Sequence, residues 1–253
     1  MTGSSSVASL LQTYLHVLQF ESVNDASSSL YFNPWKLSLE RVFPDIIFKS
    51  LSNLSQIFSP SFTRAVFVRH PFERLASAYK ERIATLPKDR IQPEPYYDGI
   101  RQRICRQYAR FDSTRHRLSK GNPCAEFIPS FEHFVQYILM NTETAAGVAR
   151  MDGHWKPYTV VCQVCKFQYN FIGRYETFDD DFTFLLKRLN VSDWDNRKRR
   201  GASGHTKWQY QQLFSSLSDE LICQLKRLYN DDFHFFNYRL EEYVNRTALI
   251  CSS

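Results

Sequence analysis

Residues 65–79 read Ala-Val-Phe-Val-Arg-His-Pro-Phe-Glu-Arg-Leu-Ala-Ser-Ala-Tyr. The apolar run Ala65–Val68 is typical of a buried strand. Pro71 follows at the position where a helix would begin, because its fixed φ suits the first helical residue. The helix expected after it has an apolar face made of Phe72, Leu75, Ala76, Tyr79 and Ile83. The segment therefore predicts a strand that leads directly into a helix.

Arg69 stands at the carboxyl end of this strand, where open α/β sheets bind ligands and where helix amides favour anions. Its planar guanidinium suits a phosphate, and each charge-assisted hydrogen bond contributes about 1.5–3 kcal/mol. Ser77 can supply a further donor from the side of the helix that carries Glu73 and Arg74, away from the apolar face. The structural alternative is that Arg69 pairs with Glu73 and that Ser77 is tolerated on the surface.

The rest of the chain supplies a second strand and further helices. Phe167–Ile172 predicts another buried strand, closed by Gly173. Expected helices are an amphipathic segment from Val7 to Leu18, one capped by Ser130, one capped by Thr177 with acidic residues in its first turn, and one within Leu213–Tyr229 that starts at Ser218-Asp219-Glu220 or a turn earlier. Strands that alternate with helices predict an α/β fold around a largely parallel sheet.

Composition bounds the class of protein. The chain has 253 residues, of which 43% are hydrophobic and 15% aromatic, and this excludes a disordered or collagen-like chain. We expect a single domain over residues 1–253, with a polar surface excursion over about 85–124. The net charge of +6 favours anionic partners such as nucleotides, nucleic acid or acidic glycans, without choosing among them.

The features that bear on cellular compartment disagree. No stretch approaches the roughly 18 consecutive apolar residues of a membrane span, and Met1–Ser9 has no signal-peptide pattern, so the chain taken literally is cytosolic. Six cysteines and three glycosylation sequons, at Asn53, Asn190 and Asn245, instead suit a lumenal protein. We therefore expect the N-terminus to be incomplete.

The pair Cys162-x-x-Cys165 leaves three interpretations open. Zinc needs about four ligands, and no second pair has finger spacing. A redox role lacks a thioredoxin-like strand–loop–helix context. Disulfides are favoured, with the connectivity undetermined.

The motif Arg-x-Pro-Phe-Glu-Arg-Leu-x-Ser-Ala-Tyr at 69–79 resembles the carbohydrate sulfotransferases of the chondroitin 4-O- and HNK-1 type. Residues 154–176, with His-Trp, Cys-x-x-Cys and Phe-Ile-Gly-Arg-x-Glu, and residues 228–238 are similar to two further blocks of that family. The resemblance runs collinearly over about residues 60–240. His70 is a departure, because relatives usually carry Asp or Glu there.

This resemblance implies a P-loop-like sulfotransferase fold and transfer of a sulfonyl group from 3′-phosphoadenylyl sulfate (PAPS) to a glycan hydroxyl. In that family the Arg and the Ser of the motif bind the 3′-phosphate of PAPS, and the resemblance implies the same role for Arg69 and Ser77. The segment Gly3, Ser4, Ser5 and Ser6 resembles the family's 5′-phosphosulfate loop. In this alignment the family's Lys falls at Met1, and we expect the family's first strand to be missing. The family consists of Golgi type II membrane enzymes with a lumenal catalytic domain, and we expect this chain to lack that membrane anchor.

Transfer to a hydroxyl needs a base, and His154 is the candidate because an imidazole titrates near neutrality. Trp155 beside it is a candidate for stacking on a sugar; the structural alternative is a His hydrogen-bonded beneath this Trp. Glu176 and His70 are rival bases. No metal is expected.

Two alternatives to a glycan sulfotransferase follow from the sequence. A binding-only pseudoenzyme would keep Arg69 and Ser77 but lack the loop Lys. A nucleic-acid-binding protein would use the basic run 197–200, although no nucleic-acid module accompanies it. The basic segments 101–117 and 197–207 favour an acidic glycan such as chondroitin as the acceptor.

Overall fold

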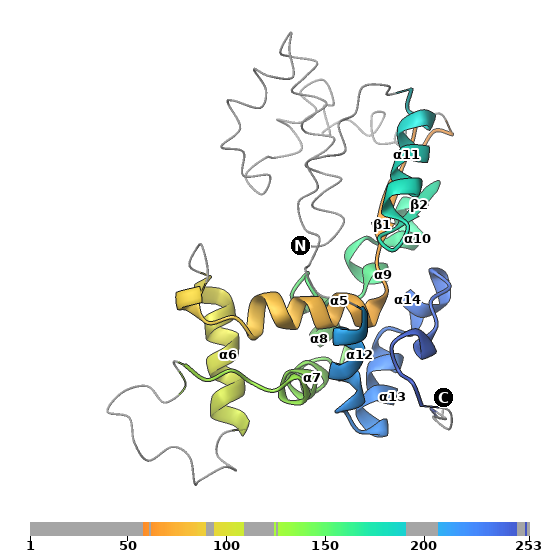
Figure 1. The fold of residues 1–253 in the computed structure, drawn as a ribbon. Coiled ribbons are helices and arrows are strands. Elements are labelled where there is room, and N and C mark those ends of the chain that lie inside the picture. The colour runs from red at the N-terminus through yellow and green to blue at the C-terminus, as the bar shows by residue number, and fades with distance from the viewer. Residues whose placement is uncertain are drawn as a thin grey trace. The chain divides into compact units, whose positions relative to one another are not determined.

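The computed structural model describes residues 58–60, 62–89, 94–108, 124, 126–190, 207–246 and 251 (Figure 1). The chain divides into two compact units, residues 1–69 with 162–202 and residues 70–161 with 203–253. The helix expected from Val7 to Leu18, the loop Gly3–Ser6 and the basic loop up to residue 206 lie outside the described residues. The single-domain expectation stays a prediction.

The first unit contains the strands β1 (Ala65–Val68) and β2 (Phe171–Arg174), which pair in parallel. Helix α11 (Phe178–Arg188) packs against them (Figure 1). The buried core of this unit is Phe67, Phe182 and Leu185. Gly173 lies opposite Phe67 in the register, and a Cβ on it would stand 2.4 Å from the Phe67 ring. Only glycine therefore fits at this position of β2.

The second strand begins later than the sequence predicts. Residues 164–167 form the short helix α10 (Val164–Phe167), with Gln163 and Gln168 in the left-handed region at its two ends. Ile172 in β2 is 45% exposed, so the expectation of a fully buried strand is wrong. A short apolar run does not by itself distinguish a strand from a helix.

Thr177 occupies the N-cap of α11, as predicted, but its hydroxyl makes a different bond. Thr177 Oγ1 donates to Asp181 Oδ2 at 2.8 Å instead of accepting from the helix backbone. The same carboxylate oxygen accepts from the backbone N–H of Arg174 at 2.7 Å. Asp181 therefore links the end of β2 to the start of α11.

The second unit is helical in its described part and is built around α5 (Pro71–Ala78). The predicted apolar face is buried, and His70 caps the helix because its Nδ1 accepts from the backbone N–H of Phe72 at 3.2 Å. The helix widens into a π turn, Tyr79–Ile83, closed by the Ala84 N–H on the Tyr79 carbonyl at 2.8 Å. Such turns are frequent at functional sites.

The remaining elements of this unit are α6 (Pro95–Tyr108), α7 (Phe131–Met140), α8 (Ala145–Arg150), α9 (Tyr158–Val161), α12 (Lys207–Ser215), α13 (Asp219–Leu228), α14 (Asn230–Phe235) and the 3₁₀ turns Pro87–Asp89 and Leu240–Glu242. Ser130 caps α7 as predicted, accepting from the His133 N–H at 3.1 Å. The start at Ser218 is confirmed for the helix expected within Leu213–Tyr229, because Ser218 caps α13, and residues 213–215 belong instead to the preceding helix α12.

The predicted surface excursion at 85–124 contains a helix with a buried face. Ile104 and Cys105 of α6 are fully buried, and Arg101 is 1% exposed. The disulfide Cys105–Cys124 ties the end of this segment back to α6. Arg101 therefore does not belong to an exposed basic surface, which corrects the acceptor interpretation of this part of 101–117.

The structure shows how the six cysteines pair. Cys105–Cys124 and Cys223–Cys251 are disulfides, whereas Cys162 and Cys165 are not disulfide-bonded. The expectation of disulfides is confirmed for two pairs and is wrong for the Cys-x-x-Cys pair.

In its described part, the chain is thus a mixed helical protein with a small parallel sheet, in agreement with an α/β sulfotransferase fold. A P-loop-like arrangement and a missing first strand stay predictions. None of the helices in the described part is long and apolar enough to cross a membrane.

Candidate functional site

Arg69 lies directly after β1, where the sequence places it. Its side chain is buried, and its guanidinium stacks over the Tyr175 ring at 4.6 Å. The backbone N–H of Tyr175 donates to the Val68 carbonyl at 2.8 Å, which holds the residue after β2 beside the end of β1. A cationic group is therefore fixed at the carboxyl end of the sheet.

Ser77 belongs to the second unit and is 4% exposed. Its hydroxyl donates to Glu81 Oε1 at 3.3 Å. Arg74, on the same side of α5, is also buried, so the polar side of this helix is covered as well as the apolar one. The alternative of a merely exposed Ser77 is wrong, and joint binding of a phosphate by Arg69 and Ser77 stays a prediction.

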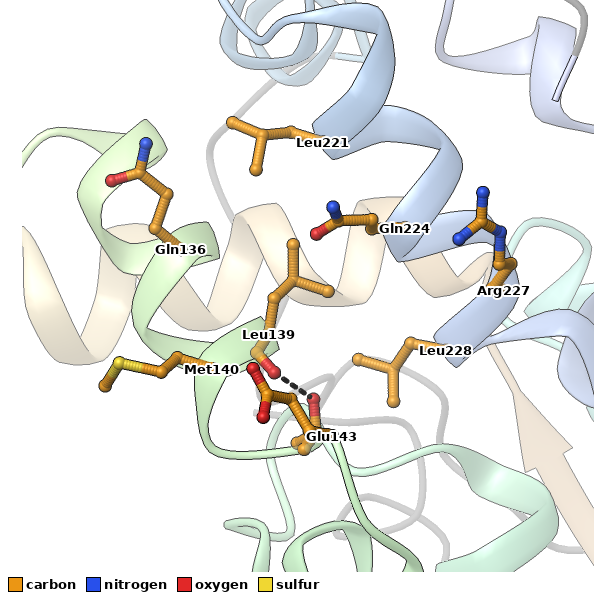
Figure 2. Close-up of a pocket in the computed structure, with 9 residues that line it drawn as sticks. Gln136, Leu139, Met140, Glu143, Leu221, Gln224, Arg227 and Leu228 are labelled. Carbon is orange, nitrogen blue, oxygen red and sulfur yellow. Dashed lines mark hydrogen bonds between the residues drawn. The ribbon is translucent and has the colours of Figure 1, made fainter. Parts of the chain in front are cut away.

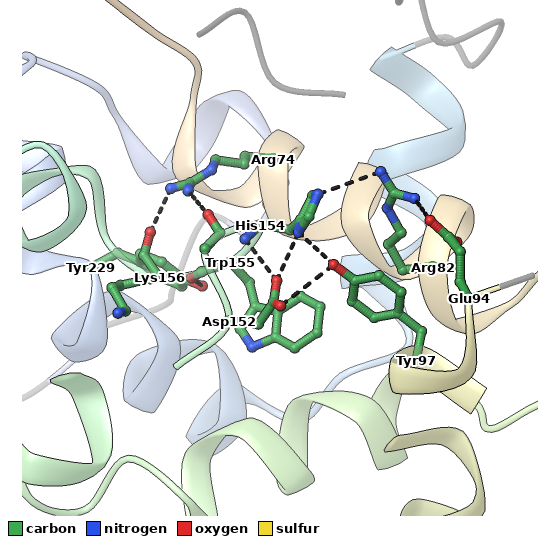
Figure 3. Close-up of polar contacts among 10 residues, drawn as sticks. Arg74, Arg82, Glu94, Tyr97, Asp152, His154, Trp155, Lys156 and Tyr229 are labelled. Carbon is green, nitrogen blue, oxygen red and sulfur yellow. Dashed lines mark hydrogen bonds and ion pairs between the residues drawn. The ribbon is translucent and has the colours of Figure 1, made fainter. Parts of the chain in front are cut away.

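His154 is the centre of a polar network in the second unit (Figure 3). Its Nδ1 lies 2.8 Å from Asp152 Oδ1 and 2.8 Å from the Tyr97 hydroxyl, and its Nε2 lies 3.4 Å from Nη2 of Arg82. Asp152 Oδ1 also accepts from the His154 backbone N–H at 2.8 Å. The imidazole side chain remains 23% exposed.

These contacts select one tautomer of the imidazole. Asp152 as a carboxylate only accepts, so Nδ1 of His154 carries the proton and donates to it. Arg82 only donates, so Nε2 faces it with a lone pair. The neutral ring therefore presents Nε2 as its basic nitrogen.

The ionisation of Asp152 follows from the same contacts. Burial favours the neutral carboxyl, but hydrogen bonds from the ring and backbone N–H of His154 outweigh burial, so the pKa of Asp152 is lowered. Burial and then the nearby Asp152 charge raise the pKa of the Tyr97 hydroxyl. Asp152 is therefore charged at neutral pH, and Tyr97 is a neutral hydroxyl.

Arg82 extends from the π turn and completes this network. It forms an ion pair with Glu94, and its guanidinium lies 5.3 Å from the centre of the Tyr97 ring (Figure 3). The side chains of Arg82 and Glu94 are 16% and 26% exposed. A fixed cation thus stands beside the basic nitrogen of His154.

The turn that carries His154 is held through its backbone carbonyls. Arg74 donates to the carbonyls of Gly153 and Lys156, the latter at 2.5 Å. The Tyr229 hydroxyl donates to the carbonyl of Trp155 at 2.5 Å (Figure 3). Two elements that are far away in the sequence, α5 and the end of α13, therefore fix this turn.

Asp232 of α14 anchors the helix that follows the turn. Its carboxylate accepts from the backbone N–H groups of Tyr158 and Thr159 at 2.7 and 2.8 Å and from the Thr159 hydroxyl at 2.9 Å. Burial raises the pKa of Asp232, although these hydrogen bonds oppose the shift. Tyr229 and Asp232 belong to the C-terminal block 228–238, whose role here is to support the turn with His154.

Two sequence-based assignments change. Trp155 is 4% exposed and packs edge-on against Phe134 at 5.2 Å, so it does not stack on a sugar. His70 is fully buried, with Nε2 at 2.9 Å from the Arg239 carbonyl. Burial lowers the pKa of His70 to about 4, and because both its nitrogens are engaged, His70 is a structural residue and not a base.

A pocket of about 600 Å³ lies between α7 and α13 (Figure 2). Leucines line it together with amide and charged side chains; its residues are Gln136, Leu139, Met140, Thr142, Glu143, Leu221, Gln224, Arg227 and Leu228. It shares no residue with the His154 network or with the predicted phosphate contacts. The described residues contain no group of three or more His, Cys, Asp or Glu that suits a metal ion.

The sequence singles out His154 but does not reveal the polar residues around it, which are Arg74, Arg82, Tyr97, Asp152, Tyr229 and Asp232. Arg74, Tyr229 and Asp232 lie inside the motif blocks that carry the resemblance. Asp152, two residues before His154, was the nearest available signal.

Comparison with known proteins agrees with these motifs. A family model described as the sulfotransferase family matches residues 3–239, a range that includes Gly3–Ser6. Carbohydrate sulfotransferase 12 of Mus musculus is 28% identical over 233 residues, covering 89% of this chain and 50% of that protein. Carbohydrate sulfotransferase 10 of Gallus gallus is 28% identical over 233 residues, covering 89% of this chain and 59% of that protein.

Carbohydrate sulfotransferase 11 of Rattus norvegicus is 29% identical over 185 residues, covering 73% of this chain and 49% of that protein. The chain spans about half the length of the curated relatives it matches. No solved structure matches it. The family match covers most of the chain, and the chain therefore belongs to the sulfotransferase family, with carbohydrate sulfotransferases among its relatives.

Proposed function

We propose that this chain transfers a sulfonyl group from PAPS to a hydroxyl of a glycan. The observation that carries the proposal is the state of His154: its Nδ1 is bound to Asp152, and its basic Nε2 is turned toward Arg82. Family membership and the names of the relatives support this class of reaction and a glycan as the acceptor.

The residues around His154 fit deprotonation of an acceptor hydroxyl. Nε2 of His154 takes the proton as the hydroxyl oxygen forms its bond to sulfur. Asp152 stabilises the imidazolium that results, because its carboxylate bonds the opposite nitrogen at 2.8 Å. The 3.4 Å contact between Arg82 and Nε2 is long for a hydrogen bond, so an acceptor hydroxyl can replace it.

The donor's phosphates fit the chemistry of the motif residues. PAPS supplies the sulfonyl group, and the bond from sulfur to the 5′-phosphate oxygen breaks with its electron pair staying on the phosphate. Arg69 offers a fixed guanidinium at the end of β1, and Ser77 offers a hydroxyl. We assign the 3′-phosphate to these two residues and the 5′-phosphosulfate to Gly3, Ser4, Ser5 and Ser6, on the strength of the motifs.

The proposed setting is the Golgi lumen, with an acidic glycosaminoglycan as acceptor. Two disulfides suit an oxidising compartment. The sequon residues Asn190 and Asn245 are exposed. The net charge of +6 favours an anionic acceptor.

The experiment is transfer of ³⁵S from labelled PAPS to chondroitin, dermatan and a neutral oligosaccharide, together with thermal unfolding in the desulfonated product, 3′-phosphoadenosine 5′-phosphate (PAP). PAP at 100 times its dissociation constant is expected to raise the melting temperature by about 5–10 °C. Arg69→Ala and Ser77→Ala are expected to remove this shift. A folded wild-type chain that neither binds PAP nor labels any glycan contradicts the proposal, and preferential labelling of the neutral sugar contradicts the acidic acceptor.

A further inference from the structure

The peptide group between Gly153 and His154 is held at both of its ends. Its carbonyl oxygen accepts from Arg74, and its N–H donates to Asp152 Oδ1 at 2.8 Å. Because a peptide group is planar, holding both its oxygen and its N–H restrains the orientation of the backbone from which the His154 side chain starts. Gly153 has no side chain that could restrain this peptide group, so the restraint comes from Arg74 and Asp152.

Arg74 spans the whole turn with one guanidinium. A second nitrogen donates to the Lys156 carbonyl at 2.5 Å, so a single planar group joins the carbonyls on either side of His154. Arg74 is 3% exposed, and its guanidinium lies 3.9 Å from the centre of the Tyr158 ring. A buried cation held by two carbonyls and a ring face has little freedom to move.

Arg74 and Ser77 are three residues apart on α5 and are neighbours on its surface. The helix that carries a predicted phosphate contact therefore also holds the turn that carries the predicted base. Both residues and the turn belong to the second unit.

We propose that Arg74 is a positioning residue for sulfonyl transfer, which locks the His154 turn to α5. This inference rests on the proposed role of His154 as the base. A reacting group that is misplaced by about 1 Å can lose about 10²-fold in rate. Arg74 is thus required for the rate of the chemical step and not for binding of the nucleotide.

The test is Arg74→Lys in the full chain, alone and combined with His154→Gln. Lysine keeps the charge but cannot bridge two carbonyls with a planar fork. We expect kcat to fall by about 10²-fold. The KM for PAPS and the PAP-induced rise in melting temperature are each expected to stay within about twofold of the wild-type value. In the His154→Gln background, Arg74→Lys is expected to cause no further loss of kcat.

Arg101→Lys is the matched control, because Arg101 is an equally buried arginine of the same unit that donates to the Thr85 carbonyl at 3.1 Å. It is expected to lower the melting temperature and leave kcat unchanged. If Arg74→Lys does not fold, Tyr229→Phe decides, since it removes only the hydroxyl that bonds the Trp155 carbonyl. We expect it to lower kcat by about tenfold, again only when His154 is present.

Two results overturn the proposal: kcat that is unchanged in the folded variants, or a loss of kcat that persists undiminished in the His154→Gln background. Failure of the proposed base gives a different pattern, because His154→Gln alone then retains the wild-type kcat. Failure of the proposed function itself is separate again, because the wild-type chain then transfers no ³⁵S to any glycan.

Discussion

Replacing Asp152 by Asn tests the pairing of a carboxylate with the imidazole. In the wild type, Nδ1 of His154 lies 2.8 Å from Asp152 Oδ1. The Asn side chain keeps an oxygen that can accept this hydrogen bond, but it carries no negative charge. A hydrogen bond to a charged partner contributes about 1.5–3 kcal/mol, against about 0.5–1.5 kcal/mol for a neutral pair. The imidazolium formed during proton transfer therefore loses about 1.4 kcal/mol of stabilisation, which corresponds to about tenfold in kcat.

The assay is the rate of ³⁵S transfer from PAPS with PAPS and acceptor both saturating, so that it reports kcat. PAP binding, measured by thermal shift, is expected to stay unchanged.

Asp98→Asn is the control for this experiment, because Asp98 is a carboxylate of the same unit that pairs with Arg101 at 3.2 Å. It is expected to keep the wild-type kcat. If Asp152→Asn leaves kcat unchanged, or if Asp98→Asn lowers kcat equally, the Asp152–His154 pairing has no part in the reaction.

Three further predictions concern stability and thiols. Burial gives His70 a folded-state pKa of about 4, against an ordinary value of 6.5, so the unfolded state binds the proton first as the pH falls. The free energy of unfolding is therefore at its full value above pH 6.5 and falls by about 3 kcal/mol by pH 4. Urea unfolding at both pH values should show this drop, and an equal drop in His70→Gln would contradict it. Gly173→Ala is expected to destabilise by about 1–3 kcal/mol, because its Cβ meets an aromatic ring, whereas Gly99→Ala, with open space around it, should stabilise helix α6 by up to about 1 kcal/mol; urea unfolding that ranks them otherwise refutes the packing. Thiol titration of the unreduced, denatured chain should find Cys162 and Cys165 and no other thiol; any other number contradicts the disulfide assignment.

Local signals explain what could be predicted from the sequence. Ser130 and the apolar spacing after it define α7, because a cap and a helical period act within a few residues. The strand Ala65–Val68 and the helix from Pro71 follow in the same way. The second strand was predicted too early in the sequence, because residues 164–174 contain short apolar runs that suit either a helix or a strand.

The support of the candidate site could not be predicted, because it depends on long-range contacts. Arg74 reaches the Gly153 carbonyl across 79 residues, and the Tyr229 hydroxyl reaches Trp155 across 74. No periodicity marks such pairs. The same limit applies to the burial of Arg101, which the basic composition of its segment suggested would be exposed.

The most direct test of the central claim is a single-turnover measurement of sulfonyl transfer in the wild type and in His154→Gln, with both proteins saturated with PAPS and a glycosaminoglycan acceptor. General base catalysis contributes about 10²–10⁴-fold. We predict a loss of that size in the rate of transfer, with PAP binding intact. Transfer by His154→Gln at the wild-type rate would contradict the account.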